Sequence, residues 1–218
     1  MRKKFDEQLD DLSQEMIYMG NLIEQAIENA VDALIHKNVE KAENIINSDD
    51  KIDNQERKIE SLCLHLLLQQ QPVAKDLRLI SSTLKMITDM ERIGDHATDI
   101  AELTIEMANQ PYIKKLEHIE QMAKEIILML INCLKAYVTR DVLTAENVIK
   151  HDDKVDKLFY MVKKDLIQMI HENYDYGEQA SDLLLIAKYF ERIGDHTTNI
   201  AEWIIFSVTG KHEKIKDF

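Results

Sequence analysis

Apolar side chains recur every three or four residues along almost the whole chain, which is the spacing of one buried helix face. This pattern breaks near residues 36–38, 69–72, 110–112, 139–141 and 173–177. Asn38 and Asp141 carry side chains that cap helix N-termini, and Pro72 suits a first helical turn. The pattern therefore predicts six helices, over residues 5–36, 39–69, 73–109, 113–139, 142–173 and 178–209.

The predicted fold class is all-α. Because the connections between helices are short, consecutive helices should be antiparallel, and each should be about 45 Å long. The composition agrees, since 218 residues contain only 5 glycines and 2 prolines. A β-sandwich or barrel needs many more turn residues, so these folds are excluded.

The chain contains an internal duplication. Residues 91–102 read ERIGDHATDIAE and residues 191–202 read ERIGDHTTNIAE, so 10 of 12 positions match at an offset of 100. Residues 49–53 and 152–156 match at an offset of 103. We therefore predict a tandem duplication of an antiparallel three-helix bundle, with residues 1–110 and 111–218 as the two repeats. The repeats form either two bundles in tandem or one pseudo-symmetric six-helix bundle.

The net charge indicates which binding partners suit the protein, and the cysteines indicate in which cellular compartment it resides. The formal net charge of −13 disfavours nucleic acid and suits a cation or a basic protein surface. Cys63 and Cys133 lie in apolar helical runs, so we expect two buried free thiols and a reducing compartment. Asp6 and Glu7 occupy the place of a signal-peptide apolar stretch, and no apolar run approaches a membrane span. These features predict a cytoplasmic protein.

Carboxylates interrupt the apolar faces of four predicted helices. In the third helix Leu84 and Ile87 lie on the same stripe as Glu91 and Asp95, so the acids belong to a packing face. The corresponding acidic stretches are Asp49, Asp53 and Glu56; Glu91, Asp95, Asp99 and Glu102; Asp152 and Asp156; and Glu191, Asp195 and Glu202.

Antiparallel pairing of neighbouring helices should bring these acidic stretches together in each half. Converging carboxylates repel one another, and a bound cation would relieve that repulsion. Oxygen ligands favour a hard or borderline cation such as Mg²⁺, Mn²⁺, iron or Zn²⁺. The alternatives are protonated carboxyl groups or a polar seam paired with Arg92 and Arg192.

Two other repeated residue types stand beside the acids. His96 and His196 lie about 140° around the helix from Glu91 and Glu191, so we expect them at a surface or against a second helix. Gly94 lies in the interior of a helix, where glycine costs about 1 kcal/mol relative to alanine. Its repetition at position 194 indicates either close helix packing or room for a ligand.

The repeated Glu-Arg-Ile-Gly-Asp-His segment, the duplication, the six helices and the paired acidic motifs together resemble the phosphate-uptake regulator family, PhoU. The resemblance extends over essentially the whole chain. The family's acidic motif falls on Asp49, Asp53, Glu91, Asp95, Asp152, Asp156, Glu191 and Asp195. By resemblance these residues hold multinuclear iron or zinc clusters, with Mg²⁺ or Mn²⁺ less favoured. Asn199 replaces the Asp99 of the first half, so the two sites are expected to differ in occupancy.

The resemblance implies a metal-binding adaptor and no enzymatic activity. Such an adaptor negatively regulates uptake by the high-affinity phosphate ABC transporter and phosphate-starvation two-component signalling. Its implied partners are the transporter ATPase subunit, a membrane-bound sensor histidine kinase and a second copy in a homodimer. Recruitment to the inner face of the membrane by its partners is also implied. A carboxylate-bridged metalloenzyme and a metal-free helical scaffold remain as alternatives.

Overall fold

The structure is a computed structural model that describes residues 2–70 and 72–211. Its described residues form helices and no strands, which confirms the all-α prediction. The elements are α1 (Arg2–His36), α2 (Val39–Ile46), α3 (Asp50–Gln70), α4 (Ala74–Met107), α5 (Glu117–Thr139), α6 (Val142–Glu172), the 3-10 turn η1 (Tyr174–Tyr176) and α7 (Gly177–Thr209).

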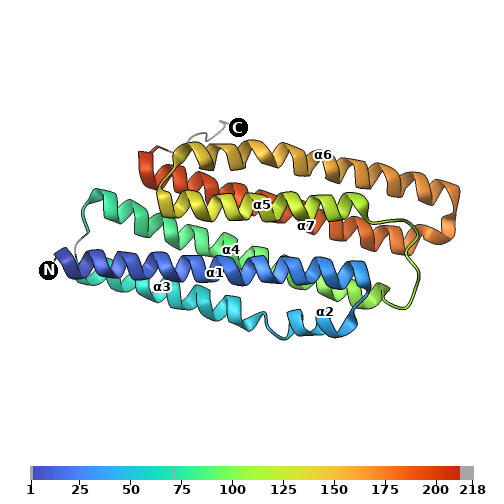
Figure 1. The fold of residues 1–218 in the computed structure, drawn as a ribbon, viewed down its shortest axis with the longest axis horizontal. Coiled ribbons are helices and arrows are strands. Elements are labelled where there is room, and N and C mark those ends of the chain that lie inside the picture. Colours follow the sequence, from blue (N-terminus) through green and yellow to red (C-terminus); the bar gives the residue numbers. More distant parts are fainter. Residues whose placement is uncertain (1, 71, 212–218) are drawn as a thin grey trace.

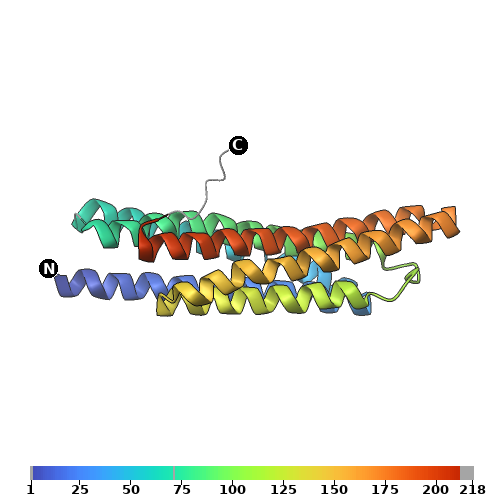
Figure 2. The same ribbon diagram turned by 90° about the horizontal axis from the view of Figure 1, so that it is seen from above.

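The helices lie lengthwise beside one another and form one elongated bundle. In Figure 1, α1–α4 occupy the lower part of the bundle and α5–α7 the upper part. The two halves meet mainly where α4 packs against α7, and α1 also contacts α5. Figure 2, turned by 90°, shows the same elongated shape along the helix axes.

An approximate two-fold relation connects the two halves. His96 and His196 are equivalent in the repeat, and their ring centroids lie 5.6 Å apart on α4 and α7. These two helices run in opposite directions (Figure 1), as a two-fold axis perpendicular to them requires. The first helix of each half also ends alike, since Lys37 and Arg140 both adopt positive φ, at 52° and 55°.

The predicted helix over residues 39–69 is wrong in one respect, because it is broken at residues 47–49 into α2 and α3. Asp49 therefore lies in a turn rather than inside a helix. The hydroxyl of Ser48 donates to the Ile45 carbonyl at 3.0 Å, a local bond that competes with helix continuation. In the second half lysine and histidine occupy the positions equivalent to Asn47 and Ser48, and α6 is unbroken.

The predicted start of the helix at residue 113 is also wrong, because α5 begins at Glu117. Tertiary contacts hold the preceding residues outside the helix. The Ile113 N–H donates to Gln179 Oε1 at 2.6 Å, and Lys114 Nζ lies 2.5 Å from Asp165 Oδ2. The remaining helix boundaries fall within three residues of the predicted ones.

The N-caps and the thiols agree with the sequence. Asn38 accepts a hydrogen bond from the Lys41 N–H, and Asp141 accepts from the N–H groups of two residues in the first turn of α6. Cys63 and Cys133 are both free and buried. Among the described residues, no helix combines the length and apolar character that a bilayer span requires.

Candidate metal centres

Three carboxylates converge in the first half of the molecule. Asp49 comes from the turn between α2 and α3, Asp53 from the first turns of α3, and Asp95 from the middle of α4. One oxygen of each lies within 4.8 Å of the other two. The antiparallel packing of α3 on α4 thus brings three of the four predicted first-half residues into reach of a single cation.

The fourth predicted residue, Glu91, lies beside this group with Glu56. Burial raises the pKa of Glu91, and the negative charge of Asp95 raises it further. Burial also raises the pKa of Glu56. Burial is the larger cause at both residues, and the neighbouring carboxylates add to it.

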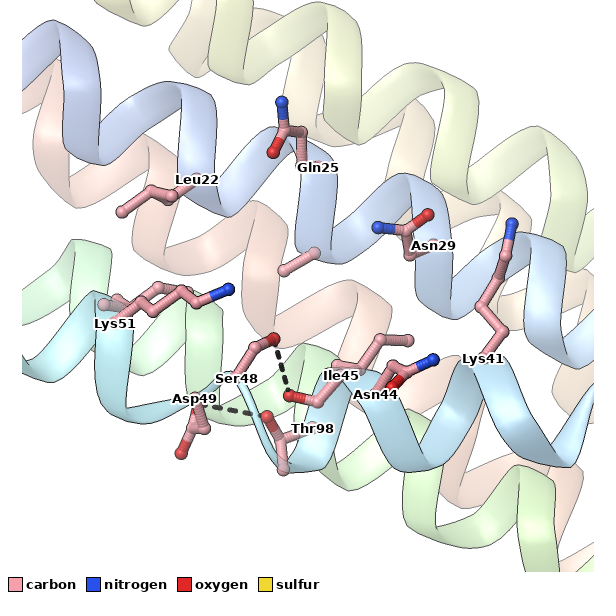
Figure 3. A pocket seen from close by; sticks show the side chains of 12 residues that line it. Leu22, Gln25, Asn29, Lys41, Asn44, Ile45, Ser48, Asp49, Lys51 and Thr98 are labelled. Carbon is pink, nitrogen blue, oxygen red and sulfur yellow. Dashed lines mark hydrogen bonds between the residues drawn. The ribbon is translucent and has the colours of Figure 1, made fainter.

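Hydrogen bonds and arginines partly compensate the first-half acids. Burial raises the pKa of Asp49, while a 3.0 Å hydrogen bond from Thr98 opposes the rise (Figure 3). Arg92 Nη1 lies 2.9 Å from Asp95 Oδ2, and Arg57 Nη2 lies 3.5 Å from Asp53 Oδ2. The predicted alternative of arginine pairing is therefore present at Arg92, which lies three residues before Asp95 and so beside it on the helix surface.

The second-half acids also lie close together. Burial and the charges of Asp156, Asp195 and Glu191 raise the pKa of Asp152 to about 7. Burial and Glu191 likewise raise the pKa of Asp156 and of Asp195. Lys188 forms an ion pair with Glu191. Among the described residues, however, only the first-half group brings three carboxylate oxygens within 4.8 Å of one another.

The two repeated glycines accommodate different neighbours. A Cβ at Gly194 would lie 2.7 Å from Asp152 Oδ1, so this glycine leaves room for a predicted ligand. A Cβ at Gly94 would lie 2.8 Å from Ile52 Cδ1 and 3.2 Å from its Cγ2, so this glycine serves core packing. At both glycines the neighbour is a protein side chain, so close packing, the first of the two interpretations of the sequence, holds in both halves: against a site residue at Gly194 and against the core at Gly94.

His96 and His196 contact other groups between α4 and α7. Nδ1 of His96 lies 3.0 Å from Asp99 Oδ2, and its ring stacks on Tyr189. Nδ1 of His196 lies 2.8 Å from Asp89 Oδ1 across the seam between the halves. The expected contact with a second helix is thus confirmed, and Asp99 faces a histidine rather than the carboxylate group.

The donor set of the first half fits a hard or borderline cation. Its three donors are carboxylate oxygens already gathered within one ion's reach, and like charges this close favour a bound cation over separate ionised groups. Sequence reasoning missed Thr98 and Arg57. Thr98 lies three residues after Asp95 on the same helix face and recurs at position 198, a spacing that signals a neighbour of the site.

The fold and these sites together define a pseudo-symmetric helical bundle with a carboxylate cluster in each half. The PhoU domain family matches residues 16–104 and 119–204. The chain therefore belongs to the PhoU family, and the resemblance seen in the repeated segment is confirmed.

Relatives match over nearly their full length. The chain is 37% identical over 217 residues to a "Phosphate-specific transport system accessory protein PhoU homolog" of Clostridium acetobutylicum, covering 99% of each chain. It is 36% identical to a protein of the same description in Aquifex aeolicus, covering 98% of each. The crystal structure of PhoU from Pseudomonas aeruginosa superposes with a TM-score of 0.91 at 31% identity, covering 95% of this chain and all of that one.

Proposed function

We propose that this protein is a regulatory accessory protein of a phosphate transport system. The observation that carries the proposal is the match, over 99% of both chains, to a relative described as such an accessory protein. The role is regulatory, and no reaction is assigned to the chain. In this role the protein acts in the cytoplasm and restrains phosphate uptake and phosphate-starvation signalling when phosphate is plentiful.

The proposed partners are the transporter ATPase subunit and a sensor histidine kinase at the inner face of the membrane, with a homodimer as the working form. The net charge of −13 supports docking to basic protein surfaces. Long exposed helix faces also provide the area that such docking needs.

Metal binding is the second part of the proposal. Asp49, Asp53 and Asp95 would hold the first cation, with Glu91 beside them; Asp152, Asp156, Glu191 and Asp195 would hold the second. The cation, iron or zinc by family resemblance, would neutralise the clustered acids and fix α3 on α4 and α6 on α7. The support for this part is the 4.8 Å grouping of the first-half oxygens and the raised pKa of Asp152.

The test is deletion of the gene in its host, followed by measurement of radiolabelled phosphate uptake and of a phosphate-starvation reporter in phosphate-rich medium. We expect both to rise and the wild-type gene to restore them. Complementation with the triple variant Asp49→Asn/Asp53→Asn/Asp95→Asn tests whether metal binding is required to restore normal uptake and reporter signal. Unchanged uptake and reporter signal in the deletion strain would refute the regulatory role, and full restoration by the variant would refute only the metal part.

A further inference from the structure

A pocket of about 440 Å³ with polar and apolar lining residues lies beside the turn at residues 47–49, bounded by α1, α2, α3 and α4 (Figure 3). Its volume is in the range of small-molecule sites. We call it the first-half pocket; the lining residues used below are Leu22, Gln25, Asn29, Asn44, Ser48, Asp49 and Lys51. Asp49 belongs both to this pocket and to the carboxylate group described above.

Several hydrogen-bonding groups of the first-half pocket have no protein partner. Within the described residues, the side chains of Gln25, Asn29, Asn44 and Lys51 form no hydrogen bond or ion pair. Figure 3 shows the Lys51 side chain extending its ammonium group into the space between α1 and the turn. All four side chains are exposed to solvent at the mouth of the pocket, where a ligand in the pocket would meet them.

The second half closes the equivalent place with ion pairs. At the offset of 103, Leu22 and Lys51 correspond to Glu125 and Lys154. Lys154 Nζ lies 2.5 Å from Glu125 Oε1, and His151, the counterpart of Ser48, lies 2.6 Å from Glu125 Oε2. A leucine in place of this glutamate leaves the Lys51 ammonium without the ion pair that Lys154 forms, so an unpaired lysine at this position is a feature of the first half.

The residues that line the pocket indicate which chemical groups a ligand should carry. Of the two lysines in the lining, Lys41 pairs with Asp32, so one unpaired ammonium and three primary amides present N–H donors. Such donors suit a group with several acceptor oxygens and negative charge. Leu22, together with Ala26 and Ile45, offers an apolar wall for an organic body. Asp49 would repel an anion on its own, but a cation on Asp49 removes that repulsion, and phosphate oxygens complete the coordination of such cations.

We propose that the first-half pocket binds a small organic phosphate, with its phosphoryl group held by Lys51 and the neighbouring amides. The inference rests on the proposed function in that a bound cation offsets the charge of Asp49. Under this proposal, only the first half of the protein binds the organic phosphate.

Calorimetric titration of the full-length protein with AMP, in the presence of saturating Mn²⁺, tests this inference. We expect AMP to bind, adenosine not to bind, and inorganic phosphate to bind more weakly than AMP. Lys51→Ala should weaken AMP binding about tenfold or more, because it removes a charged hydrogen-bond partner. Leu22→Glu should do the same by supplying Lys51 with the carboxylate that Lys154 has. Lys154→Ala is the matched control and should leave AMP binding unchanged.

Circular dichroism shows whether the Leu22→Glu protein is folded. If it is not folded, the test rests on Lys51→Ala, which changes an exposed side chain. AMP binding that is absent, equal to that of adenosine, matched by inorganic phosphate, or unchanged in the folded variants would overturn the inference. A separate Mn²⁺ titration distinguishes the two proposals. Mn²⁺ binding without AMP binding refutes the pocket alone, whereas AMP binding without Mn²⁺ binding refutes the metal site and the premise that a cation offsets the charge of Asp49.

Discussion

At the residue scale, Gly194 allows Asp152 to lie against α7. Gly194→Ala should displace this carboxylate and weaken Mn²⁺ binding at the second site, because the new Cβ would lie 2.7 Å from Asp152 Oδ1. Gly94→Ala is the matched variant; it should leave Mn²⁺ affinity intact and lower the free energy of unfolding by about 1–3 kcal/mol through overpacking against Ile52. Titrations of both variants check this, and an unchanged second site in a folded Gly194→Ala protein would contradict it.

The raised pKa of Asp152 predicts a dependence of stability on pH in metal-free protein. The folded state keeps this proton up to about pH 7, whereas the ordinary pKa of the group is 3.8. The folded state therefore binds more protons over this interval, and the free energy of unfolding should fall as pH rises from about 4 to about 7. Chemical denaturation across this range should show the fall, and Asp152→Asn should reduce it.

Two comparisons accompany that measurement. Asp10→Asn, at an exposed position, should leave the pH dependence unchanged. Saturating Mn²⁺ should stabilise the protein most near pH 7, since the cation favours the ionised carboxylates. An equal pH dependence in Asp152→Asn and the parent would refute the assignment to this residue.

The acidic stretches could be predicted from the sequence because their carboxylates lie three or four residues apart, and residues at that spacing share one helix face. The same spacing applies to the neutralising arginines, since Arg57 lies four residues after Asp53 and Arg92 three residues before Asp95. Arg92 was named from the sequence as a pairing partner, whereas Arg57 was missed although its spacing to Asp53 signals the pair. The asymmetry of Gly94 and Gly194 depends on tertiary neighbours and has no signal in the repeat itself.

At the element scale, the end of α5 offers a test of backbone strain. Arg140 has φ of 55°, a left-handed conformation that costs a residue with a Cβ about 1–2 kcal/mol. Arg140→Gly should therefore raise the free energy of unfolding by about 1 kcal/mol, and Arg140→Ala should give no such gain. Urea denaturation measures both, and equal effects of the two substitutions would contradict the argument.

The six predicted helical segments, the second of which is divided into α2 and α3, and the two N-caps could be predicted because apolar periodicity and capping are local properties of the sequence. The break at residues 47–49 was not predicted, although the run Asn47-Ser48-Asp49-Asp50 is rich in side chains that compete for backbone hydrogen bonds. The apolar period continues through this run and masks the signal. The late start of α5 depends on the bond of Ile113 to Gln179, which lies far away in sequence.

At the scale of the whole molecule, the two halves share the interface of α4 with α7. Asp89 of α4 accepts hydrogen bonds from His196 and from Asn199, at 2.8 and 3.1 Å, across this seam. A fragment of residues 1–110 would expose the face of α4 that α7 covers. We therefore expect one cooperative urea transition for the whole chain and a lower midpoint for the fragment. An equal midpoint would show that the first repeat folds independently.

The duplication predicted two equivalent halves and left open whether they form two bundles in tandem or one pseudo-symmetric bundle; the packing of α4 on α7 was not predicted. It could not predict how far the halves have diverged, because divergence lies in single positions such as Leu22 and Glu125. The assignment of residues 1–110 and 111–218 as separate repeats remains a prediction from the sequence. The seam between the repeats falls in the loop that joins α4 to α5.

The central claim is that the paired acidic faces bind metal in an accessory protein of phosphate transport. Elemental analysis of protein purified without a metal-affinity tag tests it most directly, in the parent, in Asp49→Asn/Asp53→Asn/Asp95→Asn and in the exposed-acid control Asp10→Asn/Glu28→Gln/Glu43→Gln. We predict that iron or zinc copurifies with the parent and the control and that the first variant loses about half of it. Equal metal content in all three proteins, or none in the parent, would contradict the claim.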